Sequence, residues 1–84
     1  SYYDAIYGGY VSTQRMIRKD GFKLIVYPKL RKVLLFDMAN DPEEMNDLAE
    51  KPEYQKKINM LFADLLKLQK ELNDPLDISY VRPQ

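Results

Sequence analysis

The chain has 84 residues, no net charge, and 45% hydrophobic and 31% charged residues, which is enough for one small soluble-type domain. It contains no cysteine and no histidine, which excludes disulfides, cysteine metal sites and every Ser-His or Cys-His catalytic arrangement. A zero net charge argues against nucleic acid as a partner, and no apolar run approaches the roughly 18 residues of a membrane span. We therefore expect neither nucleic acid nor a membrane as a partner. Without cysteine and histidine, the composition also argues against a self-contained enzyme.

The zero net charge conceals an asymmetry between the two halves of the chain. Residues 1–36 carry seven Lys/Arg and two Asp, a net +5, whereas residues 37–84 carry six Lys/Arg and eleven Asp/Glu, a net −5. We expect the two halves to attract each other across a contact within one fold. The alternative is a basic face that binds an external anion, formed by Arg15, Arg18, Lys19 and Lys23.

Residues 1–38 predict an antiparallel sheet of three or four strands. Strand-type sequence occurs at residues 2–7, 11–18, 22–27 and 33–38. The clearest of these alternates Phe22, Leu24 and Val26 on one face with Lys23, Ile25 and Tyr27 on the other, and residues 33–38 are apolar on both faces until Asp37. An Asp-Gly pair at residues 20–21 predicts a tight hairpin turn.

Residues 39–51 predict a turn followed by a short helix. The Asn-Asp-Pro sequence at 40–42 is typical of a turn that leads into a helix. The helix is expected over residues 43–49, with Met45, Leu48 and Ala49 on its buried side.

Residues 52–73 predict a long amphipathic helix that ends at Asn73-Asp74-Pro75. Apolar residues recur at helical spacing and form a broad stripe: Tyr54, Ile58, Leu61, Leu65, Leu68 and Leu72, widened by Phe62, Ala63 and Leu66. A broad stripe favours packing on the sheet over a self-associating coiled coil, whose seam is narrower. The expected fold is thus α+β, one domain over residues 1–84, with the helix on one sheet face and a tail at 74–84 whose path is not predicted.

Two clusters of side chains invite a chemical interpretation. Tyrosines flank Gly8-Gly9 and could stack on a sugar or an aryl ring, but we expect sheet packing and burial against a neighbouring domain instead: Tyr2, Tyr3, Tyr7 and Tyr10. A group of acids suggests a hard cation, but its spacing does not match a calcium-binding loop and we expect turn and cap roles: Asp37, Asp41, Glu43, Glu44 and Asp47. No residue is predicted to be catalytic, and none to bind a metal or cofactor.

Two stretches resemble the C-terminal region of type I sulfatases. Residues 15–27 (RMIRKDGFKLIVY) match an arginine-bearing strand, a turn and a "YKLI.Y" strand, and residues 35–49 (LFDMANDPEEMNDLA) match "LYDL" followed by "..DP.E..NLA". The Pro-Glu-Tyr at 52–54 and the Asn-Asp-Pro at 73–75 also fit, so the resemblance covers roughly residues 10–78.

The resemblance implies that this is the C-terminal subdomain of an alkaline-phosphatase-like sulfatase, a sulfuric ester hydrolase. It implies a parent whose Cys or Ser in C/S-x-P-x-R becomes formylglycine and which holds a divalent cation, usually calcium. Neither Ser12 nor Ser79 lies in such a motif, so the subdomain is expected to be catalytically inert alone. Since the chain opens with Ser1 and not methionine, we expect it to be processed or part of a longer protein.

The implied partners are the N-terminal catalytic domain of the same polypeptide and the sulfate-ester substrate of the parent. Tyr10 and Arg15 are predicted as residues at the rim of the substrate pocket. The family includes periplasmic, secreted and lysosomal members, so an exported parent fits but the compartment is not determined. The alternative is a free-standing module that binds a protein through its sheet face or helix stripe.

Overall fold

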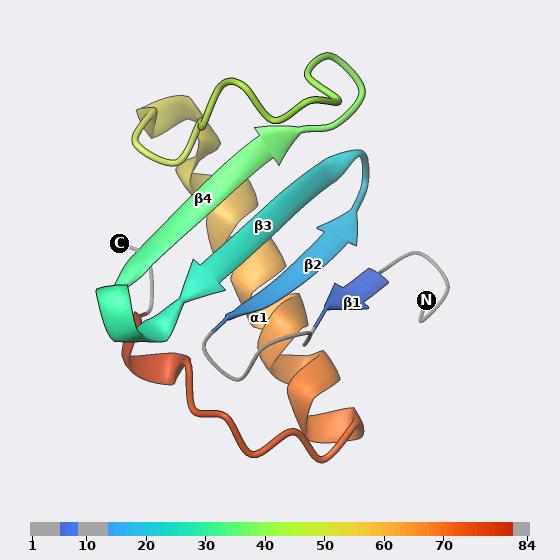
Figure 1. Ribbon diagram of the computed structural model, residues 1–84, viewed down its shortest axis with the longest axis vertical. Coiled ribbons are helices and arrows are strands. Elements are labelled where there is room, and N and C mark those ends of the chain that lie inside the picture. The colour runs from blue at the N-terminus through green and yellow to red at the C-terminus, as the bar shows by residue number, and fades with distance from the viewer. Residues whose placement is uncertain (1–5, 9–13, 82–84) are drawn as a thin grey trace.

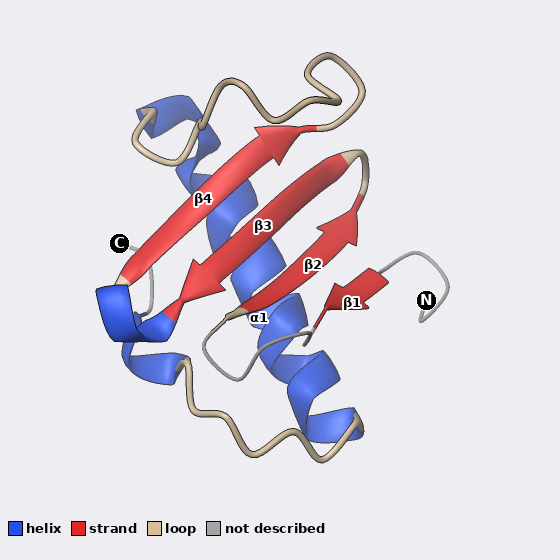
Figure 2. Cartoon of the chain, in the orientation of Figure 1, coloured by secondary structure: helices blue, strands red, loops and turns tan. Residues whose placement is uncertain are grey.

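The structure is a computed structural model that describes residues 6–8 and 14–81, and it confirms the α+β fold. One helix lies behind a four-stranded sheet, as Figure 1 shows and Figure 2 repeats by type of secondary structure. The sheet is antiparallel throughout, and its strands follow one another in chain order: β1 (Ile6–Gly8), β2 (Arg15–Lys19), β3 (Phe22–Tyr27) and β4 (Lys32–Asp37).

Backbone conformation at the two described hairpins explains the strand order. Asp20 and Gly21 both have positive φ, 55° and 80°, as a tight turn between β2 and β3 requires. A 3-10 turn at Pro28–Leu30 follows β3, and Arg31 then takes a left-handed conformation with φ 50° before β4 begins. Proline ends β3 because it cannot donate a hydrogen bond to the ladder.

The core lies between the sheet and α1 (Gln55–Glu71), which a 3-10 turn at Pro52–Tyr54 precedes. Ile17, Leu24 and Leu35 oppose one another across β2, β3 and β4, and all three are fully buried. The helix buries the centre of its predicted stripe against them: Ile58, Leu61, Phe62, Leu65 and Leu68. Packing on the sheet, and not a coiled coil, is therefore confirmed.

The edges of that stripe differ from the sequence prediction. Leu72 is 45% exposed because α1 ends at Glu71, and Ala63 is exposed on the side of the helix away from the sheet. The tail adds apolar side chains to the core in their place. Ile78 and Val81 are both buried there, and a last 3-10 turn, Ser79–Val81, lies in this part of the tail.

The short helix predicted over residues 43–49 is wrong. Residues 44–48 form no helix, and Met45, expected on the buried side, is 76% exposed. Two features stop a helix here. Glu44 has a left-handed φ of 57°, and the Asp41 carboxylate accepts hydrogen bonds from the amides of Met45 and Asn46, which would otherwise belong to a helix.

The strand bounds also differ from those predicted. β2 is described over Arg15–Lys19, so it ends one residue later than predicted and does not include Gln14, and β1 is described over Ile6–Gly8. Residues 2–5 and 11–13 of the predicted strands lie outside the described residues. Among the helices that the structure describes, none is long and apolar enough to cross a membrane.

The loop after β4 binds the outer edge of β4 at Leu35. Asp47 accepts hydrogen bonds from the amides of Leu35 and Ala49, each at 2.9 Å, and the Leu48 amide donates to the Leu35 carbonyl at 2.8 Å. These contacts satisfy backbone groups that an edge strand otherwise presents to other chains.

Replacement of Asp47 should open this edge. In D47A the Leu35 amide loses its acceptor, so we expect a loss of about 1–2 kcal/mol in unfolding free energy and faster hydrogen exchange at that amide. Denaturant unfolding and amide exchange by NMR measure the two effects. E50A, at an exposed position nearby, is the control, and equal exchange at the Leu35 amide in both variants would contradict the role of Asp47.

Candidate functional site

Of the two residues predicted at the rim of a substrate pocket, Tyr10 and Arg15, the structure describes only Arg15. Tyr10 lies outside the described residues. Arg15 begins β2 and lies opposite Val26, a fully buried core residue, so its side chain leaves the sheet on the helix side. Its role at a rim stays a prediction, but the structure reveals what its guanidinium does within the domain.

Arg15 forms a two-point ion pair with Asp74, which follows α1. Its Nε lies 2.5 Å from Oδ2 and its Nη2 3.0 Å from Oδ1, while Nη1 donates to the Gln14 carbonyl at 2.7 Å. Only 11% of the Arg15 side chain and 8% of the Asp74 side chain are exposed. This geometry matches the planar fork of arginine to a carboxylate in a weakly solvated place.

Gln69 extends the pair into a small buried network. The Gln69 Nε2 donates to Asp74 Oδ2 at 3.2 Å and to the Leu76 carbonyl at 2.8 Å, and the Leu76 amide donates to Asp74 Oδ1 at 3.1 Å. Asn73, in a left-handed conformation with φ 55°, reverses the chain at the end of α1 so that Asp74 faces β2. The network therefore ties the tail and the helix end to the start of β2.

The other cations that could bind an anion are paired or exposed. Lys19 Nζ lies 2.8 Å from Asp64 of α1, and Lys23 Nζ lies 2.8 Å from Glu44 of the loop. Arg18 is exposed, on the face of the sheet away from α1. The ion pairs of Arg15, Lys19 and Lys23 each join a cation from residues 1–36 to an acid from residues 37–84, which confirms that the two halves of the fold attract each other.

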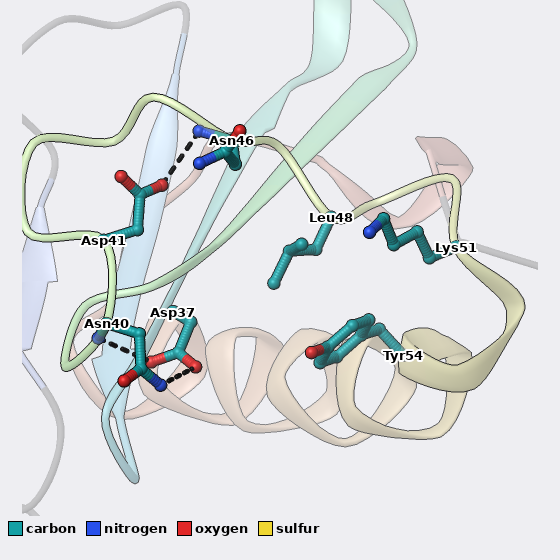
Figure 3. Close-up of a pocket in the computed structure, with 7 residues that line it drawn as sticks. All are labelled: Asp37, Asn40, Asp41, Asn46, Leu48, Lys51 and Tyr54. Carbon is teal, nitrogen blue, oxygen red and sulfur yellow. Dashed lines mark hydrogen bonds between the residues drawn. The ribbon is translucent and has the colours of Figure 1, made fainter.

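A hollow of about 360 Å³, open to solvent, lies between the loop after β4 and the start of α1 (Figure 3). It is lined by Asp37, Asn40, Asp41, Asn46, Leu48, Lys51 and Tyr54. None of these is a serine, cysteine or histidine, so the hollow contains no Ser-His or Cys-His pair.

The carboxylates in the hollow already have partners. Asp37 Oδ1 accepts hydrogen bonds from the amides of Ala39 and Asn40, and Oδ2 accepts one from Asn40 Nδ2 at 2.8 Å. Asp41 accepts hydrogen bonds from the amides of Met45 and Asn46. Two further acids of the loop are also paired: Asp47 accepts a hydrogen bond from the Leu35 amide, and Glu44 forms an ion pair with Lys23. The expected turn role of the acids Asp37, Asp41 and Asp47 is thus confirmed. The described residues include no group of three or more acidic side chains placed to hold a metal ion.

The hydrogen bonds to Asp37 lower its pKa. The Asn40 side chain contributes most, assisted by the amides of Asn40 and Ala39, while partial desolvation acts in the opposite direction. A carboxyl whose pKa is lower in the folded state adds stability above its ordinary pKa of 3.8, and this contribution is lost as pH falls through the lowered value.

We expect N40A to raise the Asp37 pKa towards its ordinary value. The side-chain carboxyl carbon, followed by NMR from pH 7 to pH 2, measures the titration. Asp77, whose pKa is lowered by its hydrogen bonds from Ser79, is an internal control that N40A should leave unchanged. An Asp37 titration identical in both proteins would contradict the assigned cause.

Sequence reasoning missed the contact between Arg15 and Asp74. The Asn73-Asp74-Pro75 sequence predicted the end of the helix. Asparagine often takes a left-handed conformation at such an end, and an acid directly after it was the signal that a carboxylate returns towards the sheet. Its partner, 59 residues away in the chain, could not be chosen among several arginines and lysines without the fold.

Comparison with known proteins establishes the family. Residues 1–71 match the family model described as "N-sulphoglucosamine sulphohydrolase, C-terminal". The chain belongs to this family of sulfatase C-terminal domains. The match spans the sheet, the loop and α1, so the resemblance of residues 15–27 and 35–49 to sulfatases is confirmed.

Solved structures agree with this sulfatase C-terminal family. The structure of BT4656 in complex with its substrate D-glucosamine-2-N,6-O-disulfate is 33% identical, has a TM-score of 0.74, and matches 88% of this chain and 17% of that chain. A structure described as a sulfatase from Bacteroides thetaiotaomicron is 28% identical, has a TM-score of 0.70, and matches 82% of this chain and 16% of its own.

A curated relative matches the sulfatase C-terminal domain as well. An uncharacterized protein of Haemophilus influenzae is 36% identical over 64 residues, which are 76% of this chain and 32% of that protein. The domain therefore spans about a third of the curated relative and about a sixth of the solved structures.

Proposed function

We propose that this domain completes a sulfatase that hydrolyses sulfate esters of amino sugars, and that it supports the catalytic domain and contributes to the rim of the substrate pocket. The observation that carries the proposal is the family match over residues 1–71, together with the 33% identity to a protein solved with a glucosamine disulfate. A further similar structure, 28% identical with a TM-score of 0.65, concerns the metabolism of glycosaminoglycans by Bacteroides thetaiotaomicron. Sulfated amino sugars are the chemistry that these names share.

In this proposal the catalytic groups belong to the larger domain. The chain contains no cysteine and no C/S-x-P-x-R motif, so the formylglycine of a sulfatase would lie outside it. Its own residues supply a rigid two-layer scaffold. The Arg15–Asp74 pair positions the beginning of β2, five residues after Tyr10 in the sequence.

The activity test uses the longer polypeptide that carries this domain. We expect it to release sulfate from glucosamine 6-sulfate, and we expect the 84-residue chain alone to release none. Ion chromatography of free sulfate measures both. A longer polypeptide that carries formylglycine and releases no sulfate from any sulfated amino sugar would overturn the proposed substrate class.

The rim residues need a test that separates substrate contact from stability. Y10F removes one hydroxyl, R15K keeps the charge of Arg15 without its fork, and Y80F at an exposed tyrosine is the control. If the rim proposal holds, kcat/KM for the amino-sugar sulfate, measured at a temperature at which circular dichroism shows each variant fully folded, falls at least tenfold in Y10F or R15K and not in Y80F. Unchanged kcat/KM in all three variants would remove these residues from the rim.

A further inference from the structure

The turn that links β3 to β4, residues 28–32, carries a concentration of positive charge. Lys29, Arg31 and Lys32 fall within four consecutive residues, and residues 21–36 contain no acid to balance them. All three side chains are exposed, and none forms an ion pair with another described residue. Three other cations of the first half of the chain are neutralised by acids of the second half. The charge of this cationic turn is therefore left to an external anion.

A tyrosine from the tail holds the Arg31 guanidinium. Its Cζ lies 5.1 Å from the centre of the Tyr80 ring, a cation–π contact that the ring makes and the hydroxyl does not. In Figure 1 the turn after β3 lies beside the last 3-10 turn, and Pro28 and Val81 anchor these two turns in buried positions. A ring against the face of a guanidinium leaves the N–H donors in the guanidinium plane able to meet an oxyanion.

The backbone of Arg31 has a conformation that suits glycine better. Its φ of 50° and ψ of 47° lie in the left-handed region, where a side chain raises the energy of the backbone and glycine does not. The turn itself is closed by the Arg31 amide, which donates to the Pro28 carbonyl at 3.1 Å and needs no side chain to do so. An exposed and oriented guanidinium at such a position indicates a role outside the fold.

Strand register places the cationic turn at the end of the sheet where β2 begins. Arg15, the first residue of β2, lies opposite Val26, and Lys32, the first residue of β4, lies opposite Tyr27. The residue proposed for the rim of the substrate pocket and the cationic turn thus share one end of the domain. A chain of sugars held at this turn would keep its sulfated units near that rim.

The chemistry of the turn and the names of similar structures indicate the anion. One similar structure holds a glucosamine disulfate, and another concerns the metabolism of glycosaminoglycans. We propose that Lys29, Arg31 and Lys32, with Tyr80 supporting Arg31, bind the sulfate groups of a sulfated amino-sugar chain. The arginine fork meets an oxyanion at two points, while the lysines act as point charges. This inference rests on the proposed function, because the polymer it names would be the source of the proposed substrate.

Binding of a fluorescent heparin octasaccharide to the longer polypeptide tests the proposal. R31G/K32A removes two charges from the cationic turn, and glycine preserves the left-handed conformation at residue 31, so the turn should still form. K67A/K70A is the matched control, because it removes two exposed cations from α1 and leaves the same net charge. Fluorescence anisotropy at about 0.15 M salt gives the Kd of each protein. Circular dichroism verifies that each variant is folded at the temperature of measurement.

We expect R31G/K32A to raise the Kd at least tenfold and K67A/K70A to raise it less than twofold. An unchanged Kd in R31G/K32A, or an equal rise in both variants, would overturn the proposal. Displacement of the octasaccharide by duplex DNA at equal charge concentration would also overturn it, because the turn would then bind any polyanion. Selective binding through the turn, in a polypeptide that releases no sulfate from glucosamine 6-sulfate, would support this site and reject the proposed function alone.

Discussion

Replacement of Arg15 by methionine is expected to destabilise the domain by about 3–5 kcal/mol. The substitution preserves much of the side-chain volume but leaves the Asp74 carboxylate, only 8% exposed, without the cation that meets both of its oxygens. A buried ion pair that loses one partner costs this much because the remaining charge is neither neutralised nor hydrated. Urea unfolding followed by circular dichroism measures the loss.

Two comparisons make the Arg15 experiment specific. R18M removes an arginine from the same strand at an exposed position, so we expect a change within about 0.5 kcal/mol. Addition of D74N to R15M removes the stranded charge and should recover part of the loss, since the two residues are in direct contact. A loss in R15M no greater than in R18M would show that the pair does not stabilise the fold.

Truncation of Leu65 to alanine is expected to cost about 2–5 kcal/mol. Leu65 lies at the centre of the α1 stripe and is fully buried among residues of the helix, the sheet and the tail. Its loss removes buried apolar contacts and leaves a cavity that a two-layer domain closes only in part. Because a domain of this size has a stability of only about 5 kcal/mol, the variant should be largely unfolded at 37 °C.

L72A is the matched control for Leu65, because it makes the same chemical change at a leucine that is 45% exposed. We expect it to cost less than about 1 kcal/mol. Thermal unfolding by circular dichroism compares the two variants. Similar melting temperatures for L65A and L72A would mean that the helix stripe does not carry the core.

Local patterns predicted most of the elements. The apolar spacing from Tyr54 to Leu68 predicted a helix on a sheet, and the Asp-Gly pair at 20–21 predicted the β2–β3 hairpin. Both are confirmed, since residues close in sequence decide these features: a hairpin turn needs positive φ, and a helix face repeats every 3.6 residues. The sulfatase resemblance rested on the order of such local pieces and is confirmed as well.

The loop after β4 shows where local pattern was insufficient. Residues 43–49 have helix-type composition, but the carboxylates of Asp41 and Asp47 bind loop amides and the β4 edge instead. Whether an aspartate begins a helix or holds a loop depends on which backbone groups the fold brings to it.

The sequence by itself determined the family, the antiparallel sheet, the long helix and the attraction between a basic first half and an acidic second half. Only the tertiary structure decided which cation meets which acid, because Arg15 and Asp74 become neighbours only after the chain has reversed at Asn73. It also decided where the tail lies, with Ile78 and Val81 in the core. Contacts between distant residues depend on the packing of whole elements, whereas strand alternation and helix periodicity are properties of a few adjacent residues.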